Sequence, residues 1–183
     1  MAVDRQDLKP SHDAIIRTME MIVEDAQRHS SCFVGNVNDF VQWFESKYKF
    51  RYRNHSDKFI VKKGEIYNCC FGYNIGSEQD KCRPAMILQN EKGNIHSSTT
   101  IVAPITDEIK AFLPTHVEIS KLSSDCSVKG IVLVEQLRCI SKRRLGKKLD
   151  FVRTDIDSWN NIITAIKREL DVYYIRIDTC SKK

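Results

Sequence analysis

The sequence lacks several features that would place it outside the ordinary globular proteins. Its 183 residues include only 7 glycines and 4 prolines, which excludes collagen-like repeats and a Gly/Pro-rich linker array. No apolar run approaches the roughly 20 residues that a helix needs to span a bilayer. The first five residues, Met-Ala-Val-Asp-Arg, lack the basic-then-apolar layout of a signal peptide. We therefore expect a soluble, cytoplasmic protein of one domain, or of one domain with an appendage.

The cysteine pattern argues against a disulfide framework and against a metal site. Seven cysteines give an odd count, with no C-x-x-C pair and no Cys/His cluster at zinc-ligand spacing. Cys69 and Cys70 could form a vicinal disulfide, but neighbours on a strand more often point to opposite faces. The sequence therefore predicts seven reduced thiols, no structural metal and no cofactor.

Positive charge is in slight excess and unevenly distributed. The net charge is +5, which is compatible with a nucleic-acid partner but does not require one. Residues 47–63 and 138–153 each carry seven cations and one anion, so either segment is a solvated surface or a phosphate-binding one. Aromatic residues alternate with cations in the first segment, which is typical of a base-stacking surface or of an edge strand. We favour the edge strand.

Helical periodicity marks both ends of the chain. Ser11 is a candidate N-cap for a helix that ends near residues 29–31, with an apolar stripe that includes Ile15, Met19 and Ile22. A second helix is predicted from about Asn38, with Phe40, Trp43, Phe44 and Tyr48 on its buried face. Two helices with one apolar stripe each should pack on each other and on something else. The helical period returns from Thr154 to Leu170.

Short apolar and β-branched segments between these helices predict five or six strands. They lie at residues 59–67, 84–88, 99–103, 116–119, 128–134 and 136–140, with a turn at 91–94. Because little helix separates them, they favour a small antiparallel β-barrel. The predicted fold class is α+β: a barrel with a C-terminal helix at residues 58–183, preceded by a helical hairpin extension at residues 1–57.

A polar loop precedes the most apolar strand. Residues 76–84, Gly-Ser-Glu-Gln-Asp-Lys-Cys-Arg-Pro, combine a hydroxyl, carboxylates, an amide and two cations at the mouth of the predicted barrel. Such a loop is well placed to meet a ligand, although an ordinary hairpin loop has the same composition.

Seven motifs, this loop among them, occur in the order and spacing found in the MazF/PemK family. They lie at residues 61–67, 76–79, 83–84, 88–90, 101–106, 113–119 and 134–138, and the resemblance extends from about Val61 to Leu170. The sequence thus resembles the toxins of bacterial toxin–antitoxin systems that are sequence-selective endoribonucleases, or mRNA interferases.

The resemblance implies an SH3-like barrel, a symmetric homodimer, a cognate antitoxin protein and single-stranded RNA as substrate. The family's catalytic arginine and threonine fall on Arg83 and Thr106. The family's substrate-contacting positions fall on Ser77, Glu78 and Gln79 of the loop and on the later pair Glu135 and Gln136. The basic segment after Leu137 should bind RNA phosphates through Arg138, Lys142, Arg143 and Arg144.

The chemistry of these residue types agrees with those roles. Metal-independent RNA cleavage proceeds by attack of the ribose 2′-hydroxyl on the adjacent phosphate, and a guanidinium matches the phosphate oxygens of the transition state. Arginine is a poor base because its pKa exceeds about 12, so we assign Arg83 chiefly to transition-state stabilisation and leave its part in proton transfer open. A catalytic pair of His96 and His116 is disfavoured, since His116 lies in a structural stretch and His96 in a solvent-facing turn.

Three departures from the family pattern leave alternatives open. About 55 N-terminal residues are additional, and they support the dimer, regulate the active site in cis or dock an unrelated partner. Asp80-Lys81-Cys82 replaces smaller residues before the arginine, and residues 68–74 are unusual for a loop at the groove. The alternative function is a non-catalytic toxin of the same superfamily that inhibits a protein such as a topoisomerase; a housekeeping RNA-binding module is disfavoured.

Overall fold

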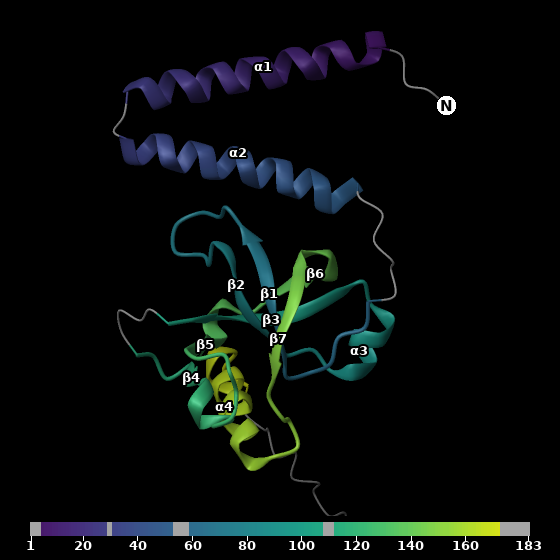
Figure 1. The fold of residues 1–183 in the computed structure, drawn as a ribbon, viewed down its shortest axis with the longest axis vertical. Coiled ribbons are helices and arrows are strands. Elements are labelled where there is room, and N and C mark those ends of the chain that lie inside the picture. Colours follow the sequence, from purple (N-terminus) through teal and green to yellow (C-terminus); the bar gives the residue numbers. More distant parts are fainter. Residues whose placement is uncertain (1–4, 29–30, 53–58, 108–111, 173–183) are drawn as a thin grey trace, which may run out of the picture. The chain divides into compact units, whose positions relative to one another are not determined.

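The computed structural model describes residues 5–28, 31–52, 59–107 and 112–172 of the chain. The chain divides into a helical unit, Met1–Arg53, and a sheet unit, Asn54–Lys183 (Figure 1). The predicted domain boundary at residue 57 lies outside the described residues. No helix within the described ranges is long and apolar enough to cross a membrane.

The helical unit contains α1 (Arg5–Arg28) and α2 (Ser31–Tyr52), which contact each other. Ser11 lies inside α1 and is not its N-cap, and α2 begins before the predicted Asn38. The predicted edge strand around residues 48–52 is also wrong, because α2 continues to Tyr52. Helical spacing pairs Glu45 with Lys49 and sets the rings of Tyr48 and Tyr52 4.8 Å apart, so these contacts favour a continued helix.

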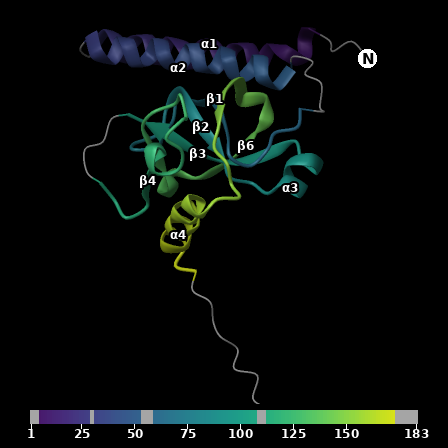
Figure 2. The same ribbon diagram turned by 60° about the horizontal axis from the view of Figure 1, so that its bottom comes forward.

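The sheet unit is built on a seven-stranded antiparallel sheet with strand order β4-β5-β3-β2-β1-β7, and β6 pairs with β3. The strands are β1 (Glu65–Gly72), β2 (Lys81–Ile87), β3 (Thr99–Thr106), β4 (His116–Glu118), β5 (Ile131–Leu133), β6 (Arg138–Ser141) and β7 (Leu145–Phe151). The order of strands does not return from β7 to β4, so the sheet is not a closed barrel. The predicted C-terminal helix is present as α4 (Asn160–Glu169), and it contacts β4 (Figure 2).

Three local features differ from the sequence prediction. Residues 59–61 precede the first strand and are not part of it. The predicted turn at 91–94 is helix α3 (Glu91–His96), because Asn90 caps it by accepting a hydrogen bond from the N–H of Gly93. Strand β7 was not predicted, since most of its residues are exposed and it lacks a clear apolar alternation. It is held in place by pairing with β1.

The sheet separates two apolar clusters, as strand alternation requires. One contains Ile66 and Met86 and is closed by Trp159 and Ile162 at the C-terminal helix. The other contains Tyr67, Cys69, Phe71, Ala85, Ile87, Val102 and Ile140. Even-numbered β1 and β2 residues thus face the first cluster, and odd-numbered ones face the second. Arg83 follows the odd-numbered pattern, which places it at the edge of the second cluster.

Candidate functional site

Arg83 and Thr106 lie at the same end of the antiparallel β2–β3 pair. The antiparallel register pairs Ala85 with Pro104 and Met86 with Ala103, and Arg83 lies two residues before Ala85 while Thr106 lies two residues after Pro104. Strand alternation puts both side chains on the face that carries Ala85 and Val102. Both residues are half-buried. A cation and a hydroxyl therefore lie at the same end of the paired strands.

The loop between β1 and β2 is tied to Arg83. The Nε of Arg83 donates a hydrogen bond to the backbone carbonyl of Asp80 at 2.9 Å. Asn74 closes the loop, because its N–H donates to Asp80 Oδ1 and its Nδ2 to the carbonyl of Gln79, both at 2.7 Å. Lys81, where the loop enters β2, has a φ of 65°. These bonds give the loop a defined conformation next to the arginine.

The predicted loop residues meet the predicted residues of the later segment. Gln136 Nε2 donates to the carbonyl of Ser77 at 3.3 Å, and Nη1 of Arg138 lies 3.8 Å from Oε2 of Glu78. Ser77 and Glu78 are exposed, whereas the side-chain oxygen of Gln79 is buried and has no hydrogen-bond partner among the described residues. The structure thus joins four of the predicted binding residues into one surface.

Glu135 has a different environment. Its carboxylate accepts hydrogen bonds from Nε2 of His116 at 3.0 Å and from the hydroxyl of Thr115 at 3.3 Å. The N–H of Leu113 donates to Nδ1 of His116 at 3.1 Å, so the ring proton lies on Nε2. Both ring nitrogens of this buried histidine are therefore engaged, which agrees with its predicted structural role. His96 is exposed at the end of α3, as predicted.

Two cations of the predicted phosphate-tracking segment are instead held by backbone carbonyls. Lys142 is buried, and its Nζ donates to the carbonyl of Asn94. Arg144 donates from Nη1 to the carbonyl of Phe71 at 2.8 Å. Burial lowers the pKa of both groups. The assignment of Lys142 to a phosphate-binding surface was therefore wrong, because its ammonium group is turned into the protein.

A disulfide joins Cys70 of β1 to Cys82 of β2, so the prediction of seven reduced thiols was wrong. The two residues lie directly opposite each other in the β1–β2 register. The spacing of the cysteines could not reveal this pairing, because it depends on which residues of two strands face each other. Cys69, Cys126 and Cys139 are free thiols. No cluster of three or more potential metal ligands occurs in the described part of the chain.

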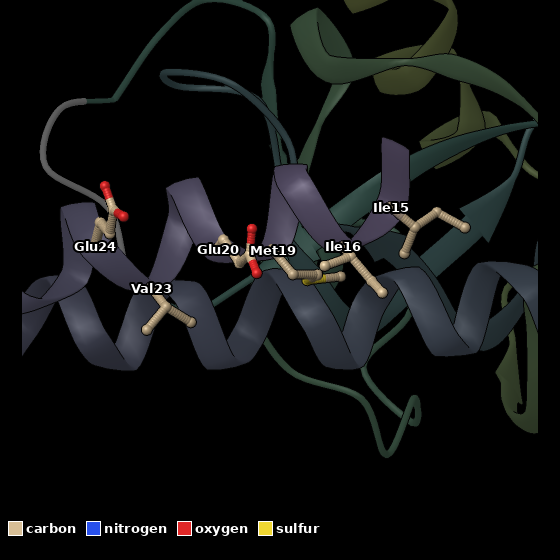
Figure 3. A pocket seen from close by; sticks show the side chains of 6 residues that line it. All are labelled: Ile15, Ile16, Met19, Glu20, Val23 and Glu24. Atoms are coloured by element: carbon tan, nitrogen blue, oxygen red, sulfur yellow. The ribbon is translucent and has the colours of Figure 1, made fainter. Parts of the chain in front are cut away.

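An apolar hollow lies on the helical unit, away in sequence from all of these residues. It is lined by Ile15, Ile16, Met19, Glu20, Val23 and Glu24, all from α1 (Figure 3). Its polar groups are the two carboxylates of Glu20 and Glu24, and no cation is among its lining residues. We therefore place the candidate site on the sheet unit.

The chain is similar to known toxins. The family described as PemK-like, MazF-like toxin of type II toxin–antitoxin system matches residues 62–169. The endoribonuclease MazF of Staphylococcus epidermidis is 44% identical over 94 residues, which cover 51% of this chain and 78% of that protein. MazF from Deinococcus radiodurans shares the fold, with a TM-score of 0.54 and 23% identity over 62% of this chain and 99% of that one.

A second solved structure has the same fold. It is a mycobacterial endoribonuclease in complex with its cognate antitoxin, with a TM-score of 0.51 and 23% identity. The likeness covers 62% of this chain and 98% of that one. The family match begins at Lys62, so the helical unit lies outside it.

Proposed function

Because the chain belongs to the family of PemK-like, MazF-like toxins of type II toxin–antitoxin systems, we propose that it is a sequence-selective endoribonuclease that cleaves single-stranded mRNA without a metal ion. The observation that supports this proposal is that Arg83 and Thr106 lie at the same end of the paired strands β2 and β3, within the segment that the family matches. Catalysis of this kind depends on placing donors around a phosphate before the reaction begins.

The proposed reaction is attack of a ribose 2′-hydroxyl on the adjacent phosphate. It forms a 2′,3′-cyclic phosphate and releases a 5′-hydroxyl, so no water and no metal-bound nucleophile enter the first step. The phosphorane gains negative charge, which Arg83 stabilises. The Nε of Arg83 is held by Asp80, and its Nη groups donate to no described residue, so they are oriented donors for phosphate oxygens. The hydroxyl of Thr106 donates a hydrogen bond to the same phosphate.

The substrate surface that we propose is formed by Ser77, Glu78, Gln79, Glu135, Gln136 and Arg138. Arg138 supplies positive charge beside the loop, and the loop and Gln136 supply polar groups that read base edges in single-stranded RNA. Glu135 fixes the segment that presents Gln136, because its carboxylate holds His116 and Thr115. The surface thus combines phosphate attraction with base reading on two segments far apart in the sequence.

We propose that the sheet is an open form of an SH3-like barrel, that α1 and α2 form a helical hairpin domain at residues 1–57, and that two copies form a homodimer in the cytoplasm. The proposed protein partner is a cognate antitoxin. A related solved structure contains an endoribonuclease bound to its cognate antitoxin, which supports this partner.

Incubation with a long RNA transcript in excess EDTA tests the proposed function. Cleavage at a small set of sites, with 2′,3′-cyclic phosphate and 5′-hydroxyl ends, is the expected result, and mapping the ends gives the recognised sequence. Intact RNA would instead favour the non-catalytic toxin that binds a protein target, the function that the family match makes the weaker one.

A further inference from the structure

Three cysteines lie on β1 and β2 beside Arg83. The register pairs Cys69 with Arg83 and Cys70 with Cys82, and the latter two are joined by a disulfide. Cys82 directly precedes Arg83 in the chain. The covalent link is therefore one residue from the proposed catalytic guanidinium along the strand.

The same disulfide lies at the base of the substrate loop. The register shifts between Cys70 and Gly72, and Gly72 and Lys81 have φ angles of 111° and 65°. Beyond this point the loop is held by hydrogen bonds of Asn74 and by the contacts of Gln136 and Arg138. Those contacts are individually weak because they compete with water. The disulfide is the strong link that holds the two strands together at the entry to the loop.

The loop conformation in the cross-linked chain restricts the site. The side-chain oxygen of Gln79, one of the proposed substrate residues, is buried without a partner among the described residues. A buried oxygen without a donor costs free energy, which is recovered when it reaches water or a ligand. Opening of the loop would therefore make the Gln79 side chain available to the substrate, and the cross-link opposes this opening.

The disulfide is also accessible to a thiol reagent. Cys82 is exposed and Cys70 is half-buried. Burial raises the pKa of Cys69 to about 12 and also raises that of Cys126, so neither is an effective thiolate at neutral pH. Among the cysteines with described side chains, Cys139 is the free thiol that is exposed. An external thiolate exchanges with the Cys70–Cys82 bond, because Cys69, Cys126 and Cys139 are thiols without an S–S bond to attack.

We propose that Cys70–Cys82 is a reversible thiol–disulfide exchange site, through which a dithiol reductant switches the proposed ribonuclease from a slow to a fast form. The effect on RNA cleavage rests on the proposed function, whereas the thiol–disulfide exchange itself does not. A reductant thiolate attacks Sγ of Cys82 and displaces the Cys70 thiolate, which takes up a proton. The second reductant thiol then attacks the mixed disulfide and releases Cys82. Two electrons and two protons pass to the protein, and the dithiol becomes a disulfide.

The experiment compares the full chain before and after reduction with dithiothreitol. Peptide mass reports the Cys70–Cys82 bond, RNA cleavage in EDTA reports activity, and hydrogen exchange reports the amides of residues 73–80. Reduction should raise the cleavage rate about tenfold and accelerate exchange in the loop. Cys82→Ser should be fast and insensitive to dithiothreitol, and the matched control Cys139→Ser should respond as the wild type does.

Each contrary outcome has a distinct meaning. If mass confirms reduction but neither loop exchange nor cleavage changes, the switch is wrong. It is also wrong if both cysteines are thiols in the purified protein and diamide does not join them. If loop exchange responds but no form of the protein cleaves RNA, the exchange site stands and the proposed ribonuclease function fails.

Discussion

Arg138 of β6 and Glu78 of the β1–β2 loop form an ion pair, with Nη1 of the arginine 3.8 Å from Oε2 of the glutamate. Both side chains are partly exposed, so the pair contributes little to stability. On the substrate surface that we propose, the carboxylate of Glu78 would occupy the position beside Arg138 that an RNA phosphate takes.

Substitution of the two partners should move RNA affinity in opposite directions. With the non-cleaving Arg83→Ala chain as background, Arg138→Ala should weaken binding of single-stranded RNA and reduce the slope of log affinity against log salt by about 1. Glu78→Gln should tighten binding about twofold, because the carboxylate no longer competes with RNA for Arg138. Fluorescence anisotropy across a salt series measures both, and equal weakening by both substitutions would contradict the phosphate role of Arg138.

Removal of either proposed catalytic group should abolish most cleavage. Arg83→Ala and Thr106→Ala should each lower the cleavage rate by about 10²–10³-fold, since each removes a preorganised donor to the phosphorane. Circular dichroism and size-exclusion chromatography should show an unchanged fold and assembly. Arg153→Ala is the matched control, because Arg153 is exposed and pairs with Asp155. Full activity of Arg83→Ala would overturn the mechanism.

Gly130 supports the position of Thr106. Its φ is 118°, and a Cβ on it would lie 2.5 Å from the carbonyl oxygen of Thr106. Gly130→Ala should therefore displace the end of β3 and lower both the cleavage rate and the melting temperature. Gly146→Ala is the control, because a Cβ there lies at an ordinary 3.4 Å from Asn68 O. A fully active Gly130→Ala variant would show that cleavage does not depend on the position of Thr106 at the end of β3.

Asp150 should make stability depend on acid pH. Its carboxylate accepts hydrogen bonds from the N–H and hydroxyl of Ser127 and from the N–H of Phe151, and these bonds hold its pKa well below the usual range. The stabilisation is therefore complete above the pKa of about 4 that aspartate has in the unfolded chain, and it is lost as the pH falls toward and through the lower pKa of Asp150 in the folded protein. Asp150→Asn should cost about 1 kcal/mol at pH 7.

Thermal unfolding between about pH 2 and pH 7 measures this effect, because that range spans the ordinary aspartate pKa. The melting temperatures of wild type and Asp150→Asn should approach each other toward the acid end, because the aspartate of the unfolded chain becomes protonated there while the folded one still resists protonation. Asp155→Asn is a control at an exposed carboxylate that pairs with Arg153. A constant difference at every pH would show that the substitution acts through packing and not through charge.

Deletion of residues 1–55 separates the roles proposed for the helical unit. We expect a weaker dimer with an unchanged cleavage rate per folded dimer, because Phe44 and Tyr48 of α2 expose apolar surface suited to supporting an assembly. Light scattering and cleavage assays on the same samples measure both properties. A faster truncated enzyme with an intact dimer would favour regulation in cis, and an unchanged rate with an intact dimer would remove that idea.

Local chemistry in the sequence determined much of this protein. Apolar and β-branched runs predicted most of the sheet, helical periodicity predicted the final helix, and the order of the seven motifs by itself indicated the family. The same signals failed where neighbours decided the outcome. Strand β7 exists because β1 pairs with it, and residues 48–52 are helical because their side chains pair four residues apart.

Tertiary structure alone decided how the site residues relate to one another. The sequence named Glu78 and Arg138 as single residues, but the fold determined that they form an ion pair, and strand pairing determined that Arg83 and Thr106 lie at the same end of β2 and β3. Lys142 has the sequence environment of a surface cation, and yet the fold turns its ammonium group inward to Asn94. An odd count of cysteines without paired spacing predicted seven free thiols, and the bond between Cys70 and Cys82 contradicts it. A disulfide needs opposed strand positions, which no spacing along the chain can reveal.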